Sequence, residues 1–489
     1  MGMINRIGLL IVGIIISLSF YSCTDKKPTQ PNILFLLADD WSYPYSELYG
    51  EMAIRTPNLV KLSEKGIRFD NAYCAAPSCT PSRAGILTGK YPHNLGEGVN
   101  LCGKLDFNIP TFVKILRESG YSVAYDRKGW APGDYTLMGY SENPCGDKTE
   151  FANLLQNLPE EKPFFFWFGT DDPHRKFDRN VGATPNITTD QIKVPPFLPD
   201  SPDIRQDLVD YFNEIERFDR EIGELLAMLE KSGKLENTII VVTSDNGMPF
   251  PHAKANLYDA GTRVPLIISG YGVKPQSKIN NSFVNLIDLM PTFLEMAGEK
   301  VNTIVDGISL MPILKGEKTE HRNEIFLERE RHCLCRAELD YNAGYPIRAV
   351  RNNEFLFIQN FRPDRNPAGD EFIPNTVSEY GDVDGGLTKI YMMDHRNLPS
   401  VKPLFDMAFG KRPAEELYEL KNDPYNMKNV ADLPENKQKK EALKNQLHQW
   451  MKEKNDPRLD GKGDEIDAYE STTWAWITRD GIVFWDKKK

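Results

Sequence analysis

Three short runs of apolar residues constrain the fold of this chain more than any other feature. They lie at 31–38, 163–168 and 238–243. The runs are continuous rather than alternating, which is the pattern of strands buried on both faces of a parallel sheet. Carboxylates, in one case with a histidine, follow each run closely. Because ligands bind at the carboxyl ends of such strands, we expect these polar residues to form one site.

Helical patterns separate and follow these runs. One spans 110–119 and closes before Gly120, and a long amphipathic stretch spans 204–232 and closes before Gly233. A further strand-like segment at 264–269 is followed by a helical segment near 286–297. Alternating strands and helices predict an α/β fold whose sheet is covered on both faces.

The character of the chain changes beyond about residue 314. Short strand-like pieces such as 354–358 alternate with turn-rich linkers, and one amphipathic helix spans 436–454. We therefore expect an N-terminal catalytic domain at 32–320 and a smaller C-terminal α+β domain at 321–489.

The N-terminus predicts export. An apolar run at 7–20, after Arg6, is short for a membrane span and typical of a signal peptide, which we place at 1–22. The sequence around Cys23 resembles a relaxed bacterial lipobox, so we expect a lipidated Cys23, a tether at 23–31 and attachment to the outer membrane, in the periplasm or at the cell surface. The alternative is a plain secretory signal. Export permits disulfides, with the pairing left open, among Cys74, Cys102, Cys145, Cys333 and Cys335.

The most specific motif is Cys79-Thr80-Pro81-Ser82-Arg83, followed by Leu87-Thr88-Gly89. It resembles the signature of the type I sulfatase family, whose fold is the alkaline-phosphatase-like mixed sheet flanked by helices. The resemblance implies that a maturation enzyme oxidises Cys79 to formylglycine. One hydroxyl of the hydrated aldehyde would then attack sulfur, and the other would expel sulfate. Arg83 would reach back to this diol. Without the whole motif, such a cysteine would be a buried thiol or half of a disulfide.

Two pairs of oxygen ligands point to a metal. Asp39-Asp40 ends the first apolar run, and adjacent buried carboxylates repel each other unless a cation neutralises them. Asp245-Asn246 follows the third run. These hard ligands suit calcium or magnesium. The resemblance implies one Ca²⁺ bound by these four residues together with Cys79. In isolation, Asp-Asp is more often a cap or a turn.

Three further residues match the family's catalytic positions. Lys128 matches its catalytic lysine, His174 its sulfate-binding or leaving-group histidine, and Lys254 a sulfate contact. Read without the family, Lys128, Arg83 and Lys254 would be three solvated surface charges. Many members have a histidine two residues after the lysine, where this chain has Trp130. We consider His252 a possible substitute.

The second domain carries a structural hallmark and candidate specificity residues. Glu-Leu-Tyr-Glu-Leu-Lys-Asn-Asp-Pro at 416–424 resembles the second-domain motif of the family. An Arg-His pair there would bind a carboxylate or a second sulfate, so we treat Arg331, His332 and Arg348 as candidate substrate-binding residues beside His252. An ion-paired surface strand explains the same charges equally well.

Several stretches resemble the sulfamidase, or heparan N-sulfatase, branch, including 172–175, 194–200 and 245–251. The resemblance implies a sulfated carbohydrate substrate, with N-sulfoglucosamine of heparan-type glycans preferred and an O-sulfate of an algal polysaccharide such as ulvan as the alternative. Two other classes remain: a phosphatase or phosphodiesterase of the same fold, and an inactive lipid-anchored glycan-binding protein. The net charge of -11 disfavours a nucleic-acid partner.

Overall fold

The computed structural model describes residues 30–177, 187–301, 303–339, 341–372, 379–471, 474–478 and 481–485. An eight-stranded sheet in the order β4-β3-β5-β1-β6-β7-β2-β8 forms its centre. The three apolar runs form its adjacent strands β5 (Phe164–Gly169), β1 (Asn32–Ala38) and β6 (Thr238–Ser244). The others are β2 (Gly66–Tyr73), β3 (Ser122–Arg127), β4 (Asp147–Lys148), β7 (Arg263–Gly270) and β8 (Ile279–Asn285).

The sheet is mixed. Strand β1 pairs in parallel with β5 and β6, whereas β7 runs antiparallel to both β6 and β2. The segment at 264–269 therefore forms a strand, but one of opposite direction to its neighbour β6. The prediction of an α/β fold with a mixed sheet flanked by helices and a smaller C-terminal domain is confirmed.

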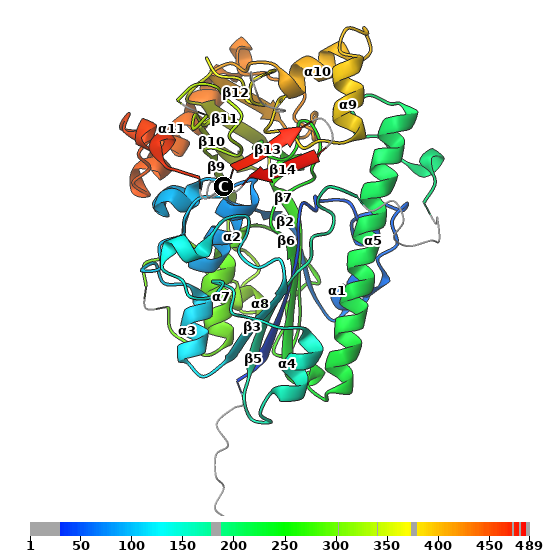
Figure 1. Ribbon diagram of the computed structural model, residues 1–489, viewed down its shortest axis with the longest axis vertical. Helices are drawn as coiled ribbons and strands as arrows, with labels where there is room; N and C mark the ends of the chain where they lie inside the picture. Colours follow the sequence, from blue (N-terminus) through cyan, green and yellow to red (C-terminus); the bar gives the residue numbers. More distant parts are fainter. Residues whose placement is uncertain are drawn as a thin grey trace, which may run out of the picture.

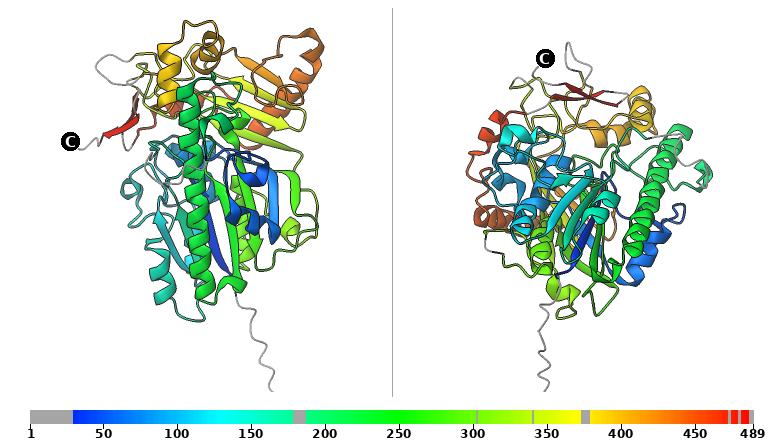
Figure 2. Two further views of the ribbon diagram at one scale, coloured as in Figure 1. Left: turned by 90° about the vertical axis from the view of Figure 1, so that its right-hand side faces the viewer. Right: turned by 60° about the horizontal axis from the view of Figure 1, so that its bottom comes forward.

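Helices cover both faces of this sheet (Figures 1 and 2). Alternate residues of β1 point to opposite faces, so Leu34 and Leu36 belong to one hydrophobic core and Ile33 and Phe35 to the other. The first core includes α1 (Pro57–Glu64), α4 (Phe151–Asn157) and α5 (Pro202–Lys231). The second includes α2 (Cys79–Thr88), α3 (Phe112–Glu118) and α7 (Leu289–Met296). Two helices of four residues each, α6 (Asp259–Thr262) and α8 (Met311–Leu314), complete this domain.

The helix boundaries follow local signals. Helix α5 begins with Pro202, and the Ser201 hydroxyl accepts a hydrogen bond from the backbone N–H of Ile204. It ends shortly before Gly233, which has a positive φ of 72°. The helical segment expected at 286–297 splits into a 3-10 turn (Leu286–Asp288) and α7, because the Asn285 side chain caps the turn at the backbone N–H of Ile287.

The second domain is built on an antiparallel sheet in the order β12-β11-β10-β9. Its strands are β9 (Glu324–Arg329), β10 (Ile347–Asn352), β11 (Phe355–Asn360) and β12 (Glu415–Glu419). Helix α11 (Lys437–Glu453) packs on this sheet, with Trp450 stacked on Phe326 at 4.9 Å between ring centroids. The domain also holds α9 (Leu387–Asp394), α10 (Lys402–Phe409) and a two-stranded sheet of β13 (Trp474–Thr478) and β14 (Gly481–Trp485).

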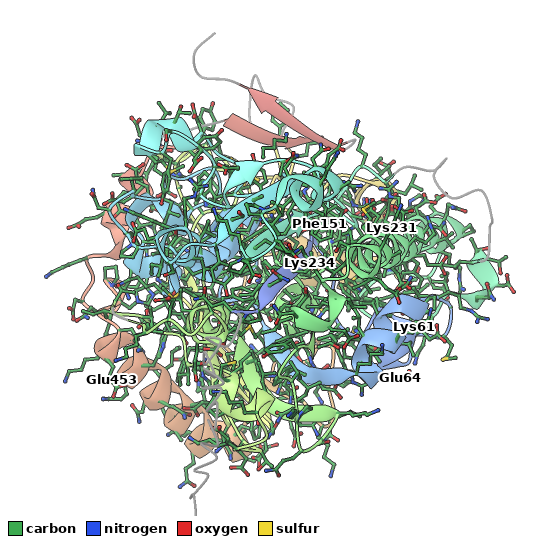
Figure 3. The ribbon with its side chains drawn as sticks, turned by 90° about the horizontal axis from the view of Figure 1, so that it is seen from below. Lys61, Glu64, Phe151, Lys231, Lys234 and Glu453 are labelled. Atoms are coloured by element: carbon green, nitrogen blue, oxygen red, sulfur yellow. The ribbon has the colours of Figure 1, made fainter. Side chains whose placement is uncertain are left out.

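The arrangement of the layers is also visible from below (Figure 3). Lys61 and Glu64 of α1 lie on the same side of the molecule as Lys231 at the end of α5, and Glu453 of α11 lies on the opposite side.

The six cysteines from Cys74 to Cys335 are free thiols in the structure. Within the described residues, no helix is long and apolar enough to cross a membrane. The predicted signal peptide, lipidated Cys23 and nearly all of the tether lie outside the described residues.

Candidate active site

Strands β1 and β6 bring the two pairs of oxygen ligands together. Ala38 lies opposite Ser244 in the parallel register, so the residues that follow each strand emerge side by side. The backbone N–H of Asp40 donates to Oδ1 of Asp245 at 3.2 Å. Asn246 Nδ2 donates to Oδ1 of Asp40 at 2.6 Å. All four side chains are buried, so their charges interact strongly.

Helix α2 places Cys79 beside these carboxylates. Ser78 is extended and precedes the helix, so Cys79 occupies its first turn, where backbone N–H groups favour an anion. Its Sγ lies 3.3 Å from Oδ1 of Asp39. Burial raises the pKa of the Cys79 thiol well above its usual range. An uncharged thiol at this position is a poor nucleophile, because the thiolate is the reactive form.

The oxygen ligands fit a divalent cation. The ligand atoms of Asp39, Asp40, Cys79 and Asp245 all lie within 4.8 Å of one another. Burial raises the pKa of Asp40 and of Asp245, which shows that these carboxylates lack sufficient positive charge around them. The Oδ1 atom of Asn246 is buried and has no hydrogen-bond partner among the described residues. A hard cation such as Ca²⁺ would satisfy both requirements.

Arg83 lies on the other side of the carboxylates. Its guanidinium is fully buried and donates to Oδ2 of Asp245 at 2.8 Å and to the carbonyl of Gly129 at 2.7 Å. Its Nη2 lies 3.8 Å from Asp39 Oδ1. Burial lowers the pKa of Arg83, but the nearby carboxylates of Asp245 and Asp39 raise it by more. The net result is a pKa above the usual range. Arg83 is therefore a fixed positive charge that holds Asp245 in place.

Two lysines complete the cationic side of the site. Lys128, which directly follows β3, forms an ion pair with Asp39 and lies 3.6 Å from Cys79 Sγ. Lys254 contacts Asp40 Oδ2 at 2.8 Å. Burial lowers the pKa of each lysine, but neighbouring carboxylates raise it above its usual range. Both lysines therefore stay charged and can bind an oxyanion next to Cys79.

His174 lies at the edge of the same cluster. Its Nδ1 is hydrogen-bonded to the carbonyl of Arg175, which fixes the proton on Nδ1. Its Nε2 then lies 3.8 Å from Oδ2 of Asp40. Burial, followed by Lys254, lowers the pKa of His174. The imidazole is thus held with one nitrogen available to a ligand.

These groups open into a cleft of about 680 Å³ between the two domains. Cations dominate its lining, which is the arrangement that an anionic ligand requires. The lining residues that carry the argument are Cys79, Lys128, His174, Arg175, Lys254 and His332.

The structure brings one of the four candidate substrate-binding residues to the cleft. His332 lines it, and its Nδ1 lies 2.8 Å from the hydroxyl of Ser78. His252 is fully buried away from the cleft, stacked on Tyr258 at 4.1 Å. Its aromatic neighbours therefore give His252 a packing role, and it does not replace the histidine that is absent at position 130.

Arg331 and Arg348 also lie away from the cleft. Arg348 is fully buried and donates to Asp456 and Glu330. Arg331 donates to the backbone carbonyls of Asn342 and Tyr469. Arg348 is held through its ion pairs and Arg331 through its Nη1, and neither lines the cleft, so the structure gives both a structural role. Trp130 is buried in the second hydrophobic core, and its backbone N–H donates to Asn143 Oδ1 at 3.1 Å.

Sequence reasoning missed Asp384 of the second domain. Its Oδ2 lies 3.5 Å from Nζ of Lys254, behind the wall of the cleft. The signal that could have found it is the loop 381–386, in which two aspartates stand among three glycines. Such a loop allows close backbone approach, but nothing in the sequence pairs it with Lys254.

Comparison with known proteins identifies families and relatives that this chain resembles. The family model "Sulfatase" matches residues 31–299, and the model "N-sulphoglucosamine sulphohydrolase, C-terminal" matches residues 251–354. Human N-sulphoglucosamine sulphohydrolase is 28% identical over 87% of this chain and 91% of its own length. An ulvan-active sulfatase of Formosa agariphila is 28% identical over 87% of this chain and 75% of its own length.

Solved structures share the fold. One, determined in complex with its substrate D-glucosamine-2-N,6-O-disulfate, has a TM-score of 0.63 and 21% identity over 88% of this chain and all of its own. Another, described as a 2-O GAG sulfatase, has a TM-score of 0.63 and 20% identity over 88% of this chain and 94% of its own.

Proposed function

The chain belongs to the sulfatase family, and on that premise we propose that it releases sulfate from a sulfated carbohydrate, preferentially N-sulfoglucosamine of heparan-type glycans. The observation that carries the proposal is the position of Cys79. It lies at the start of α2, beside four metal-type ligands and two charged lysines, at the base of a cationic cleft.

The family's modified cysteine and cation would complete this site. Formylglycine made from Cys79 would supply a hydrated aldehyde as nucleophile, and Asp39, Asp40, Asp245 and Asn246 would hold Ca²⁺, which would supply positive charge to the site. The described residues provide the remaining functions. Lys128 and Lys254 bind sulfate oxygens, and Arg83 keeps Asp245 oriented. These fixed charges stabilise the charge that develops on sulfate during transfer.

His174 is the proposed proton-transfer group. Its Nδ1 is held by the Arg175 carbonyl, so Nε2 faces the cleft and can hold or move a proton at the leaving group. The leaving group would be the amine of a sulfamate or the hydroxyl of a sulfate ester. Both chemistries need the same proton, so the position of His174 is compatible with either.

The charges around the cleft support a polyanionic carbohydrate. Arg127, Lys148 and Lys176 line its rim and are exposed. The chain as a whole carries a net charge of -11, but cations line this cleft. The positive potential is therefore concentrated where an anionic glycan would enter. The match of residues 251–354 to the second sulfohydrolase model favours N-sulfoglucosamine. The ulvan-active relative favours the second candidate, an O-sulfated algal polysaccharide.

A substrate panel tests the proposal. Protein produced together with a formylglycine-generating enzyme, with Ca²⁺ present, would be incubated with sulfated mono- and disaccharides, including N-sulfoglucosamine and ulvan oligosaccharides. Free sulfate would be measured. We expect release from N-sulfoglucosamine. Release from O-sulfated sugars alone would favour the second candidate, and release from none of them would contradict the proposal.

The export prediction extends the proposal to the cell. We infer that Cys23 carries the lipid that anchors the protein to the outer membrane. Replacement of Cys23 by Ala should remove incorporation of a labelled fatty acid and release the protein from the membrane fraction. Unchanged labelling of the variant would contradict the anchor.

A further inference from the structure

Two of the cations that line the cleft are not neutralised by a carboxylate. Five of the seven lysines and arginines in its lining form ion pairs within the described part of the chain. Lys148 and Lys176 are the other two, and neither forms an ion pair with a described residue. Both are exposed to solvent. Asp171, the exposed carboxylate of the lining, is not within ion-pair distance of either lysine.

The arginines of the cleft show the contrast. The guanidinium of Arg175 donates to both oxygens of Asp207, at 2.8 and 2.7 Å. Arg127 is paired in a similar way with Glu221 of α5. A cation that already has a carboxylate partner attracts a second anion weakly, because the two charges largely cancel at a distance. The unpaired ammonium groups of Lys148 and Lys176 keep their full attraction for an anion that enters the cleft.

Lys148 lies beyond the position where sulfate would be bound. It belongs to β4 and stands opposite Tyr125 of β3 in the parallel register. Lys128, whose Nζ lies 3.6 Å from Cys79 Sγ, follows Tyr125 by three residues. Its backbone therefore lies about 10 Å further along β3 than the level of Lys148. This separation suits a group on a neighbouring sugar and not the sulfate that is transferred.

Lys176 lies on the side of the leaving group. It follows His174, the proposed proton-transfer group, by two residues, and both line the cleft. The residue between them, Arg175, is held by Asp207, which anchors this segment to α5. The part of a glycan that His174 would protonate is thus the part that Lys176 would meet.

We propose that Lys148 and Lys176 form a second anion subsite, which binds a carboxylate or a sulfate on the sugar next to the one that loses its sulfate. The inference rests on the proposed function and makes both lysines specificity-determining residues. An ammonium group acts as a point charge with three hydrogen-bond donors and does not require a planar partner. The subsite therefore selects for negative charge on the neighbouring sugar, and a neutral neighbour gains nothing from it.

The test compares three disaccharides that differ only in the sugar next to N-sulfoglucosamine. In the first this sugar is a uronate, in the second its carboxyl group is reduced to an alcohol, and in the third the reduced sugar carries a sulfate. For the unmodified chain, kcat/KM should be about three- to tenfold higher for an acidic disaccharide than for the neutral one. The acidic disaccharide that shows this preference identifies the anion as carboxylate or sulfate.

The lysines are tested by the double change Lys148→Gln and Lys176→Gln. It should bring the ratio of kcat/KM for the acidic disaccharide to kcat/KM for the neutral one close to one, because glutamine keeps hydrogen-bond donors but carries no charge. Lys162→Gln removes an exposed lysine that does not line the cleft and should leave the ratio unchanged. A ratio that the double change leaves intact would overturn the inference. So would a preference that is absent from the unmodified chain.

A binding measurement gives a second readout without turnover. Calorimetry on Ca²⁺-loaded Cys79→Ala protein should show binding of the acidic disaccharide weakened about three- to tenfold by the double change, and binding of the neutral one weakened less. Equal weakening of both ligands would overturn the inference. Failure of the proposed function would instead appear in the unmodified chain, as no sulfate release from any of the three disaccharides.

Discussion

Single residues in the site are held by partners far away in the sequence. Arg83 is buried between Asp245 and the carbonyl of Gly129, and Lys254 lies between Asp40 and Asp384. Each buried charge therefore depends on its partner, since removal of one leaves the other uncompensated.

Asp245→Ala tests the metal shell at this scale. The change removes a proposed Ca²⁺ ligand and leaves Arg83 without its carboxylate. We expect Ca²⁺ affinity to fall by more than about tenfold and stability by about 3–5 kcal/mol. Calorimetric Ca²⁺ titration and urea unfolding measure the two effects, with exposed Asp432→Ala as the control. Unchanged Ca²⁺ affinity would remove Asp245 from the metal shell.

Cys79→Ser tests the nucleophile. A serine ester of sulfate lacks the second hydroxyl through which the proposed diol releases sulfate, so multiple turnover should fall by at least about a thousandfold. The fold should be retained, because serine and cysteine are similar in size. Steady-state sulfate release and thermal unfolding provide the readouts. Sustained turnover by the variant would contradict the mechanism.

The sequence located those site residues that directly follow a predicted strand or stand inside a specific motif. Asp39 and Asp245 are examples, because the parallel register of β1 and β6 brings strand ends together. It could not locate Asp384, whose loop reaches Lys254 only through the packing of two domains. His252 lies within a matching motif, but its ring stacks on Tyr258 instead of facing the cleft.

At the scale of elements, local sequence patterns determined what could be predicted. Continuous apolar runs predicted β1, β5 and β6, and an amphipathic pattern that closes before Gly233 predicted α5 within two residues of its limits. The direction of β7 could not be read from its sequence, because the choice between parallel and antiparallel pairing depends on the connections between strands.

Helix α11 provides a test of packing between elements. Leu447 is fully buried against the second sheet. Leu447→Ala should lower the free energy of unfolding by about 2–5 kcal/mol, because it removes buried methyl groups and leaves a cavity. Chemical unfolding of Leu447→Ala measures the loss, and exposed Asn445→Ala on the same helix should change little. A loss below about 1 kcal/mol for Leu447→Ala would show that α11 packs loosely.

At the scale of the whole molecule, a buried ionic network joins the two domains. His93 of the first domain forms an ion pair with Glu328 of β9, while Arg348 lies between Asp456 and Glu330. Arg348 supplies the positive charge that this cluster of carboxylates needs, which explains why it does not face the cleft. The network fixes the second domain, and with it His332, over the site.

This network predicts a pH dependence of stability. Burial lowers the pKa of His93, but Glu328 and Asp456 raise it above its usual value despite the opposing charge of Arg348. The pair's contribution is therefore fully present below about pH 6.5 and is lost as pH rises through the raised folded pKa. His93→Gln should flatten this part of the pH profile of urea unfolding, and His395→Gln should not. An unchanged profile in His93→Gln would contradict the assignment.

Mass spectrometry of the peptide that contains Cys79 tests the central claim most directly. The protein would be produced together with a formylglycine-generating enzyme, digested and analysed as the intact peptide. The account predicts that residue 79 carries the aldehyde or its hydrate. A peptide that retains only the unmodified thiol would contradict a formylglycine-dependent sulfatase and favour a protein that binds glycans without hydrolysing them.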